Sequence, residues 1–131
     1  MTTDEAALKI LENHKKKFRC LNRVHDLTKE LERVIDSGDV DVLKITVEMR
    51  QQQLDVCRQM DAETERLVKK LPPEESARYF KLTHHQESPP EQNSQIEEDI
   101  YSMTERIARQ LEKTIVYDRQ FTNKFKRTIR K

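Results

Sequence analysis

Apolar side chains recur every three or four residues along most of the chain, and this spacing places them along one side of an α-helix. Two such stretches precede the first proline, one over about residues 3–36 and one over about residues 40–71. A third covers about residues 94–130. The pattern therefore predicts three long amphipathic helices.

The first two predicted helices are separated by Asp36-Ser37-Gly38-Asp39, which contains the only glycine of the chain. Glycine has no Cβ and suits the left-handed residue that closes a helix. The carboxylate of Asp39 can accept a hydrogen bond from the first turn of the next helix. Two long helices joined by so short a link must fold back as an antiparallel hairpin.

The second predicted helix carries the most regular stripe, in strict alternation of three and four residues: Val40, Leu43, Val47, Arg50, Leu54, Cys57, Asp61, Thr64, Val68 and Leu71. This is heptad spacing, and three polar residues interrupt it. Arg50, Asp61 and Thr64 either pair across helices or face a gap that a partner fills. We favour pairing, because polar residues in such stripes commonly set the register of packed helices.

A connector over residues 72–93 follows the second helix and holds all four prolines. Pro72 and Pro73 lack amide hydrogens and end the helix. Residues 74–82 can form a short helix, and the rest of the connector reads as an exposed loop. Ser94 and Glu97 match a capping box, which marks the start of the last helix.

The last predicted helix has its own apolar stripe, formed by Ile96, Ile100, Met103, Ile107, Leu111, Ile115, Phe121, Phe125 and Ile129. We expect the part from Ile96 to Leu111 to pack on the hairpin. Beyond Ile115 the stripe becomes aromatic and lies among basic residues, so that part can pack internally or contact a partner protein. The candidate partner-binding residues are Tyr117, Phe121, Phe125 and Ile129.

Composition narrows the fold class to helices with a thin core. Only 34% of the 131 residues are hydrophobic and 37% are charged, with no tryptophan and one glycine. This suits long helices that bury one side, and it argues against strands. We predict a single all-α domain, either an antiparallel three-helix bundle or an elongated helical hairpin with a third long helix.

Little in the sequence indicates catalysis or a bound cofactor, and we expect a protein that is not an enzyme. One glycine is too few for a glycine-rich phosphate loop. His84 and His85 are adjacent in a proline-flanked loop, where they do not converge on one metal ion without further ligands. Cys20 and Cys57 lack metal-ligand or redox-motif spacing and read as small buried residues. We therefore predict no cofactor and no metal.

The formal net charge of +1 hides a gradient along the chain. Residues 119–131 carry six basic and no acidic side chains. This short patch supports only weak, salt-sensitive contacts with nucleic acid or a membrane surface, so neither is the expected partner. No apolar run approaches the roughly 20 residues of a membrane span, and the first residues lack the layout of a signal peptide. We expect a cytoplasmic location.

The turn and its flanks carry a resemblance. A long helix that ends in Leu31-x-x-Val34-Ile35-x-Ser37-Gly38-Asp39-Val40-Asp41-x-Leu43 and leads to Arg50-x-x-x-Leu54 resembles the hairpin of flagellar type III export chaperones of the FlgN and FliT kind. The motif covers about 25 residues, and the architecture covers the whole chain.

The resemblance implies a chaperone that binds the C-terminal helical segment of an export substrate and delivers it to the secretion machinery. By position, it implies that Phe121, Phe125 and Ile129 correspond to the substrate-binding stripe and that Tyr117 has a role in docking to the export gate. A different class of function is compatible with the same residues, namely a structural or regulatory coiled-coil subunit of a homo- or hetero-oligomer. Both hypotheses predict a protein partner, and both allow a homodimer.

Overall fold

The computed structural model describes the backbone of residues 1–130 and the side chains of residues 1–124 and Lys126. It contains four helices, α1 (Thr3–Ser37), α2 (Val40–Lys69), α3 (Pro73–Thr83) and α4 (Gln95–Arg130), and this part of the chain has no strand. The predicted all-α class is confirmed. The three long helices lie where their apolar periodicity places them, and the short helix of the connector is also present.

The turn between α1 and α2 has the predicted form. Gly38 has a φ of 74°, and its amide donates to the carbonyl oxygens of Val34 and Ile35, both at 3.2 Å. The Oδ1 atom of Asp39 accepts a hydrogen bond from the amide of Val42 at 3.1 Å. One residue thus closes α1 and the next opens α2, which forces the two helices into a hairpin.

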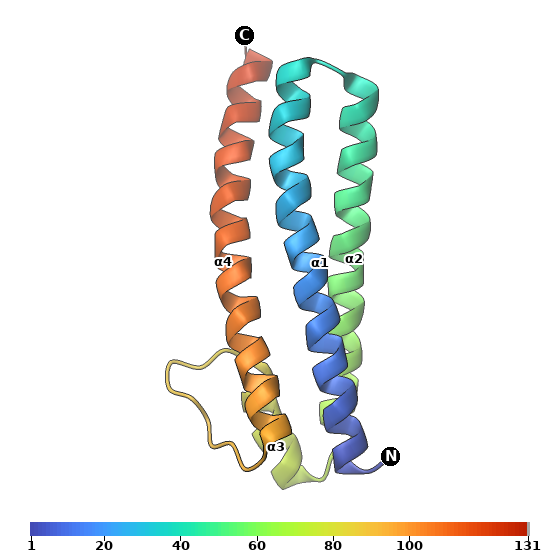
Figure 1. Cartoon of the computed structure of the whole chain (residues 1–131), viewed down its shortest axis with the longest axis vertical. Helices are drawn as coiled ribbons and strands as arrows, with labels where there is room; N and C mark the ends of the chain where they lie inside the picture. Colours follow the sequence, from blue (N-terminus) through green and yellow to red (C-terminus); the bar gives the residue numbers. More distant parts are fainter. Residues whose placement is uncertain (131) are drawn as a thin grey trace.

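Helix α1 lies at the centre of the arrangement (Figure 1). It packs against both α2 and α4, whereas the backbones of α2 and α4 do not approach each other closely over the described residues. Helix α3 lies at the lower end and contacts both α2 and α4. The four helices therefore occupy the four positions of a helical bundle, with α3 in the position diagonal to α1.

The fourth position is only partly filled. Helix α3 has 11 residues, while α2 has 30 and α4 has 36. At 1.5 Å per residue, α3 covers about 16 Å of a bundle about 50 Å long. Above α3, no fourth helix of the described residues lies beside the inward sides of α2 and α4.

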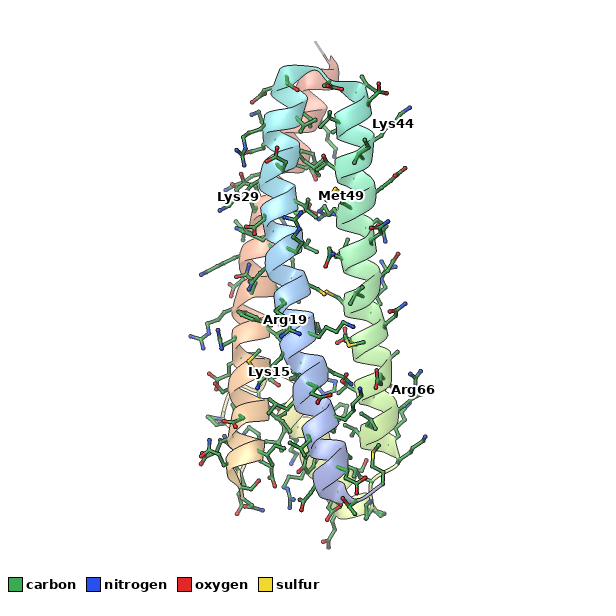
Figure 2. The ribbon with its side chains drawn as sticks, turned by 45° about the vertical axis from the view of Figure 1, so that its right-hand side comes forward. Lys15, Arg19, Lys29, Lys44, Met49 and Arg66 are labelled. Atoms are coloured by element: carbon green, nitrogen blue, oxygen red, sulfur yellow. The ribbon has the colours of Figure 1, made fainter. Side chains whose placement is uncertain are left out.

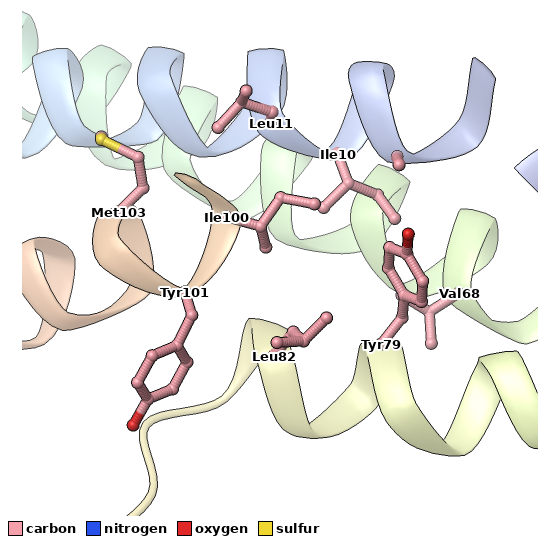
Figure 3. Packing of buried hydrophobic residues seen from close by; sticks show 9 residues of the cluster. Ile10, Leu11, Val68, Tyr79, Leu82, Ile100, Tyr101 and Met103 are labelled. Atoms are coloured by element: carbon pink, nitrogen blue, oxygen red, sulfur yellow. The ribbon is translucent and has the colours of Figure 1, made fainter. Parts of the chain in front are cut away.

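The main apolar core lies at the end of the bundle where α3 is present (Figure 3). All four helices contribute to it, through Ala7, Ile10, Leu11, Val68, Tyr79, Leu82, Ile100, Tyr101 and Met103. A smaller cluster of Cys20, Leu21, Cys57 and Ile107 continues it along the rod. Charged side chains such as Lys15, Arg19 and Lys44 project from the outer surface (Figure 2).

The three polar residues that interrupt the stripe of α2 all pair with α1. Thr64 Oγ1 accepts from Asn13 Nδ2 at 3.4 Å, and Asp61 Oδ1 accepts from Lys17 Nζ at 2.7 Å. Arg50 Nε donates to Thr28 Oγ1 at 2.9 Å. Of the two interpretations of these residues, pairing across helices is confirmed. The bonds fix the register of the hairpin between Arg50 and Thr64.

The start of α4 is capped by the predicted residues, with one difference. Ser94 Oγ accepts from the amide of Glu97 at 3.3 Å. The Glu97 carboxylate turns to the amide of Asn93 at 3.4 Å and forms an ion pair with Arg78 Nε at 3.1 Å. Glu97 is buried, and its pairing with Arg78 ties α3 to α4. The capping residue therefore also holds the short helix in place.

Candidate functional site: an uncovered apolar face beyond α3

Tyr117, one of the four predicted partner-binding residues, contacts α1. Its hydroxyl donates to Glu32 Oε2 at 2.6 Å, and its ring meets His25 edge-on with centroids 5.4 Å apart. The hydrogen bond to Glu32 raises the pKa of Tyr117. This residue helps to hold the upper part of α4 against α1.

The other predicted partner-binding residues lie further along α4. Phe121 is half-buried and makes contacts within the chain. The side chains of Phe125 and Ile129 lie outside the described residues. A role of these four residues in partner binding stays a prediction.

Replacing Tyr117 by phenylalanine tests how much the α1–α4 contact contributes. The substitution keeps the ring against His25 but removes the hydroxyl that Glu32 accepts from. We expect Tyr117→Phe to lower the free energy of unfolding by about 1 kcal/mol, the usual net value of one hydrogen bond. Urea titration followed by circular dichroism measures it. An unchanged midpoint would show that the bond contributes nothing to the packing of α4.

The largest departure from the sequence prediction is at the middle of α4. Leu111 was expected to pack on the hairpin, but 40% of its surface is exposed, and Ile115 is 45% exposed. On α2, Val47 is 49% exposed and Leu54 is half-buried. We call these four residues the uncovered face.

An ion pair shows that the two halves of the uncovered face point toward the same space. Arg50 Nη2 of α2 donates to Asp118 Oδ1 of α4 at 2.8 Å. Val47 and Leu54 lie one turn before and after Arg50, and Ile115 and Leu111 lie one and two turns before Asp118. The four aliphatic side chains therefore border the unfilled fourth position, and the ion pair crosses its floor.

A pocket of about 950 Å³ lies beside α3. It is lined by parts of α1, α2 and α3, with Val68, Leu71, Ala77 and Phe80 as its apolar residues. Asp61 also lines it and lies two turns after Leu54 on α2. The uncovered face and the pocket therefore lie along the same side of α2.

The inner wall of the pocket contains a buried histidine. His14 Nε2 lies 3.1 Å from Thr104 Oγ1, whose hydroxyl donates to the carbonyl oxygen of Leu82 at 2.7 Å. Because that proton is directed at Leu82, the Nε2–H group of neutral His14 donates to Thr104. Burial, followed by the charge of Lys17, lowers the pKa of His14 to about 4. His14 therefore joins α1, α4 and α3 as an uncharged side chain at neutral pH.

A second apolar strip lies on the opposite side of α2, away from the uncovered face. Val42, Ile45 and Met49 are 42%, 57% and 38% exposed. Met49 contributes to a shallow depression between α1 and α2 whose other residues are mostly charged. The N-terminal half of α2 is thus apolar on two sides.

The described residues offer few groups for chemistry. They contain no cluster of three or more His, Cys, Asp or Glu side chains that could hold a metal ion. Burial raises the pKa of the Cys57 thiol to about 11, so it stays protonated and poorly nucleophilic at neutral pH. None of the described helices is long and apolar enough to cross a membrane. The surface, rather than a catalytic cluster, is the feature that suggests function.

The sequence contained one signal for the uncovered face. Helix α1 can bury only part of the wide stripe of α4, and the connector holds too few helical residues to cover the remainder.

Comparisons of the chain with protein families, with curated proteins and with solved structures found no match.

Proposed function

We propose that this protein binds a helical segment of another protein in the unfilled fourth position of its bundle. The observation that carries the proposal is the uncovered face, where aliphatic side chains of α2 and α4 border a position that α3 fills only at one end. An amphipathic helix in that position completes a four-helix bundle, which is a recurring mode of peptide recognition.

The size of the apolar contact favours reversible capture over permanent assembly. Fully burying one aliphatic side chain contributes about 1.5–3 kcal/mol, and the residues of the uncovered face are about half exposed. Covering all four contributes about 4 kcal/mol, which is at the low end of the cost of association. The pocket, with the exposed ring of Phe80 at its edge, must add to this. The expected affinity is moderate, as suits a protein that releases its partner.

A chaperone of type III export is the specific case that we propose. It has the reversible capture of a helix in common with the binding mode described above, and the sequence of the hairpin turn supports it. In this proposal, the partner is the C-terminal helical segment of an export substrate, and capture and delivery take place in the cytoplasm. By the same resemblance, Phe121, Phe125 and Ile129 are the proposed partner-binding residues of α4, and Tyr117 is the proposed residue for docking at the export gate.

Charged substitutions in the uncovered face test the binding mode. We expect Ile115→Asp to weaken binding of a synthetic leucine-striped amphipathic helix of about 20 residues at least tenfold, because a carboxylate is then buried without a partner. Fluorescence anisotropy of the labelled peptide measures the affinity. Ile115→Asp should leave the helicity of the free protein unchanged, since Ile115 is already 45% exposed.

Val116→Asp is the matched control for this experiment. Val116 is 49% exposed on the same helix but is turned about 100° away from Ile115. The Val116→Asp variant should bind the peptide with native affinity. Equal losses in the two variants, or no loss in either, would contradict binding at the uncovered face.

A structural subunit of an oligomer is the second candidate, and the strip of Val42, Ile45 and Met49 favours it. A stable coiled-coil assembly buries such a strip permanently. Light scattering over a dilution series separates the two functions. A tight oligomer that Ile45→Asp breaks into monomers supports the structural subunit, whereas a monomer at all concentrations supports the capture of a partner helix.

A further inference from the structure

The pocket beside α3 contains a hydrogen-bond acceptor that no group of the described residues satisfies. We infer that this pocket is the anchor site of the bound helix and takes an aromatic side chain with a hydrogen-bond donor. Tyrosine and tryptophan have this chemistry. The inference rests on the proposed function and adds the type of residue that anchors the partner. The position of the pocket, its unpaired acceptor and its exposed ring carry the inference.

The pocket lies where a helix in the unfilled fourth position ends. Helix α3 ends at Thr83, which lines the pocket, and the chain then leaves the bundle as the connector loop (Figure 1). On α2, the pocket begins at Asp61, two turns or about 10 Å beyond Leu54 of the uncovered face. A helix that covers the uncovered face and continues for two more turns therefore brings one of its ends to the pocket.

The acceptor is the Nδ1 atom of His14. The Nε2–H group of this uncharged ring donates to Thr104, so Nδ1 is the unprotonated nitrogen. Nδ1 makes no hydrogen bond within the described residues, and the chain does not enclose it fully. Only 6% of His14 is exposed, and the residue lines the pocket. The pocket is therefore the open space beside this acceptor.

An unpaired acceptor among apolar walls discriminates between the rings that enter the pocket. A phenylalanine ring displaces water from His14 Nδ1 and leaves the nitrogen without a hydrogen bond, which costs free energy. A phenol hydroxyl or an indole N–H group takes the place of that water and restores the bond. The pocket therefore favours an aromatic donor over an apolar ring of similar size.

The walls of the pocket suit an aromatic ring. Val68, Leu71 and Ala77 are apolar. The ring of Phe80 stacks on His84 with centroids 4.0 Å apart, and yet 54% of Phe80 is exposed. This pair offers an aromatic surface that the described residues leave open. Aromatic rings that pack on one another gain more free energy than apolar burial alone provides.

The two carboxylates of the pocket do not select a donor in the same way. Asp61 is exposed and forms an ion pair with Lys17 at 2.7 Å. Glu65 is exposed and forms an ion pair with Lys69 at 3.0 Å. An exposed carboxylate gains little from one more donor, because water already supplies that hydrogen bond. His14 Nδ1 is therefore the atom that distinguishes one ring from another.

Two small probes test the chemistry of the pocket on the full chain by long-range proton–nitrogen NMR. The first is p-cresol, which is the side chain of tyrosine, and the second is p-methylanisole, which has a similar ring without a donor. We expect p-cresol to move the Nδ1 resonance of His14 upfield, because the nitrogen then accepts a hydrogen bond, whereas p-methylanisole should not. The resonance is identified by its absence from His14→Gln. A resonance that p-cresol leaves in place would overturn the inference.

Labelled peptides test whether the bound helix supplies the ring. They have the leucine stripe of the peptide used for the uncovered face and differ only at the last stripe position, which is tyrosine in one and phenylalanine in the other. A second pair carries the two residues at the opposite end, so that both directions of the bound helix are covered. In one of the two pairs, fluorescence anisotropy should show about fivefold tighter binding of the tyrosine peptide, since one hydrogen bond is gained.

Narrowing the pocket locates the effect on the protein. Ala77 is exposed on α3 and lines the pocket, so Ala77→Trp should remove the preference for the tyrosine peptide. Ala62→Trp makes the same change at an exposed position of α2 outside the residues that line the pocket, and it should keep the preference. Circular dichroism should show native helicity in both variants, because both positions are exposed.

The outcomes separate the inference from the proposed function. If the tyrosine and phenylalanine peptides bind equally and Ile115→Asp weakens both, the uncovered face captures helices and the anchor inference is wrong. If tyrosine is preferred but Ala77→Trp keeps that preference, the ring binds elsewhere and the inference is also wrong. If no peptide binds, the proposed function falls and the inference with it.

Discussion

Lowering the pH from 7 to 5 is expected to reduce the free energy of unfolding by about 2 kcal/mol through one side chain, His14. In the folded state its pKa is lowered from the ordinary value of 6.5 to about 4, chiefly by burial. The unfolded chain therefore binds a proton more readily than the folded one. The contribution of His14 to the free energy of unfolding is fully present above about pH 7, and it is lost as the pH falls from about 6.5 toward 4.

The physical reason is the position of His14 among three helices. Its ring is buried, contacts Thr104 and lies near Lys17, so a proton on the ring is neither hydrated nor close to an unpaired anion. Asp61 acts in the opposite direction and raises the pKa of His14, but it does not offset the effect of burial. Its carboxylate is already paired with Lys17 at 2.7 Å.

Urea titrations of the native protein and of His14→Gln at pH 7 and pH 5 measure this contribution. Glutamine retains an amide donor for Thr104 but does not titrate, so the variant should lose about 2 kcal/mol less than the native protein between the two pH values. His85→Gln, a substitution in the exposed connector, should behave like the native protein. A native pH dependence in His14→Gln would assign the acid sensitivity to other groups.

Two isoleucines of α4 should respond very differently to the same substitution. Ile100 is fully buried between α1, α3 and α4, and Ile100→Ala should lower the free energy of unfolding by about 2–5 kcal/mol. Ile115 is 45% exposed on the uncovered face, and Ile115→Ala should cost no more than about 1 kcal/mol.

The pair is a control for itself, because the residue type, the helix and the atoms removed are identical. Thermal or urea unfolding followed by circular dichroism gives the two values. Equal destabilisation by the two substitutions would mean that Ile115 is packed as tightly as Ile100, which would remove the basis for a partner-binding surface at this position.

The hairpin could be predicted from the sequence because its signals are local. Gly38 and Asp39 adopt the backbone and cap that their chemistry favours, and Arg50 pairs across the helices as a polar residue in an apolar stripe does. The apolar periodicity of residues 96–129 likewise predicts the long helix α4. Such features depend on residues within a few turns of one another or on strict heptad spacing.

The partner surface could not be predicted in the same way, because it depends on which side of α1 each helix occupies. A stripe of apolar residues indicates that one side of α4 is apolar, but not how much of it α1 covers. Leu8 likewise fits the stripe of α1 and yet is 56% exposed, whereas the polar Thr28 is fully buried. These residues follow the packing geometry rather than their own hydrophobicity.

The central position of α1 also determines how the protein responds to mechanical force. The two ends of the chain lie at opposite ends of the rod, the start beside the foot of α1 and the finish at the top of α4 (Figure 1). Tension applied to both ends therefore slides α4 along α1 instead of peeling the two helices apart turn by turn. All contacts between these parallel helices bear the load together, so extension requires them to rupture in a single event. The α1–α2 hairpin can then separate one turn after another, starting from its open end.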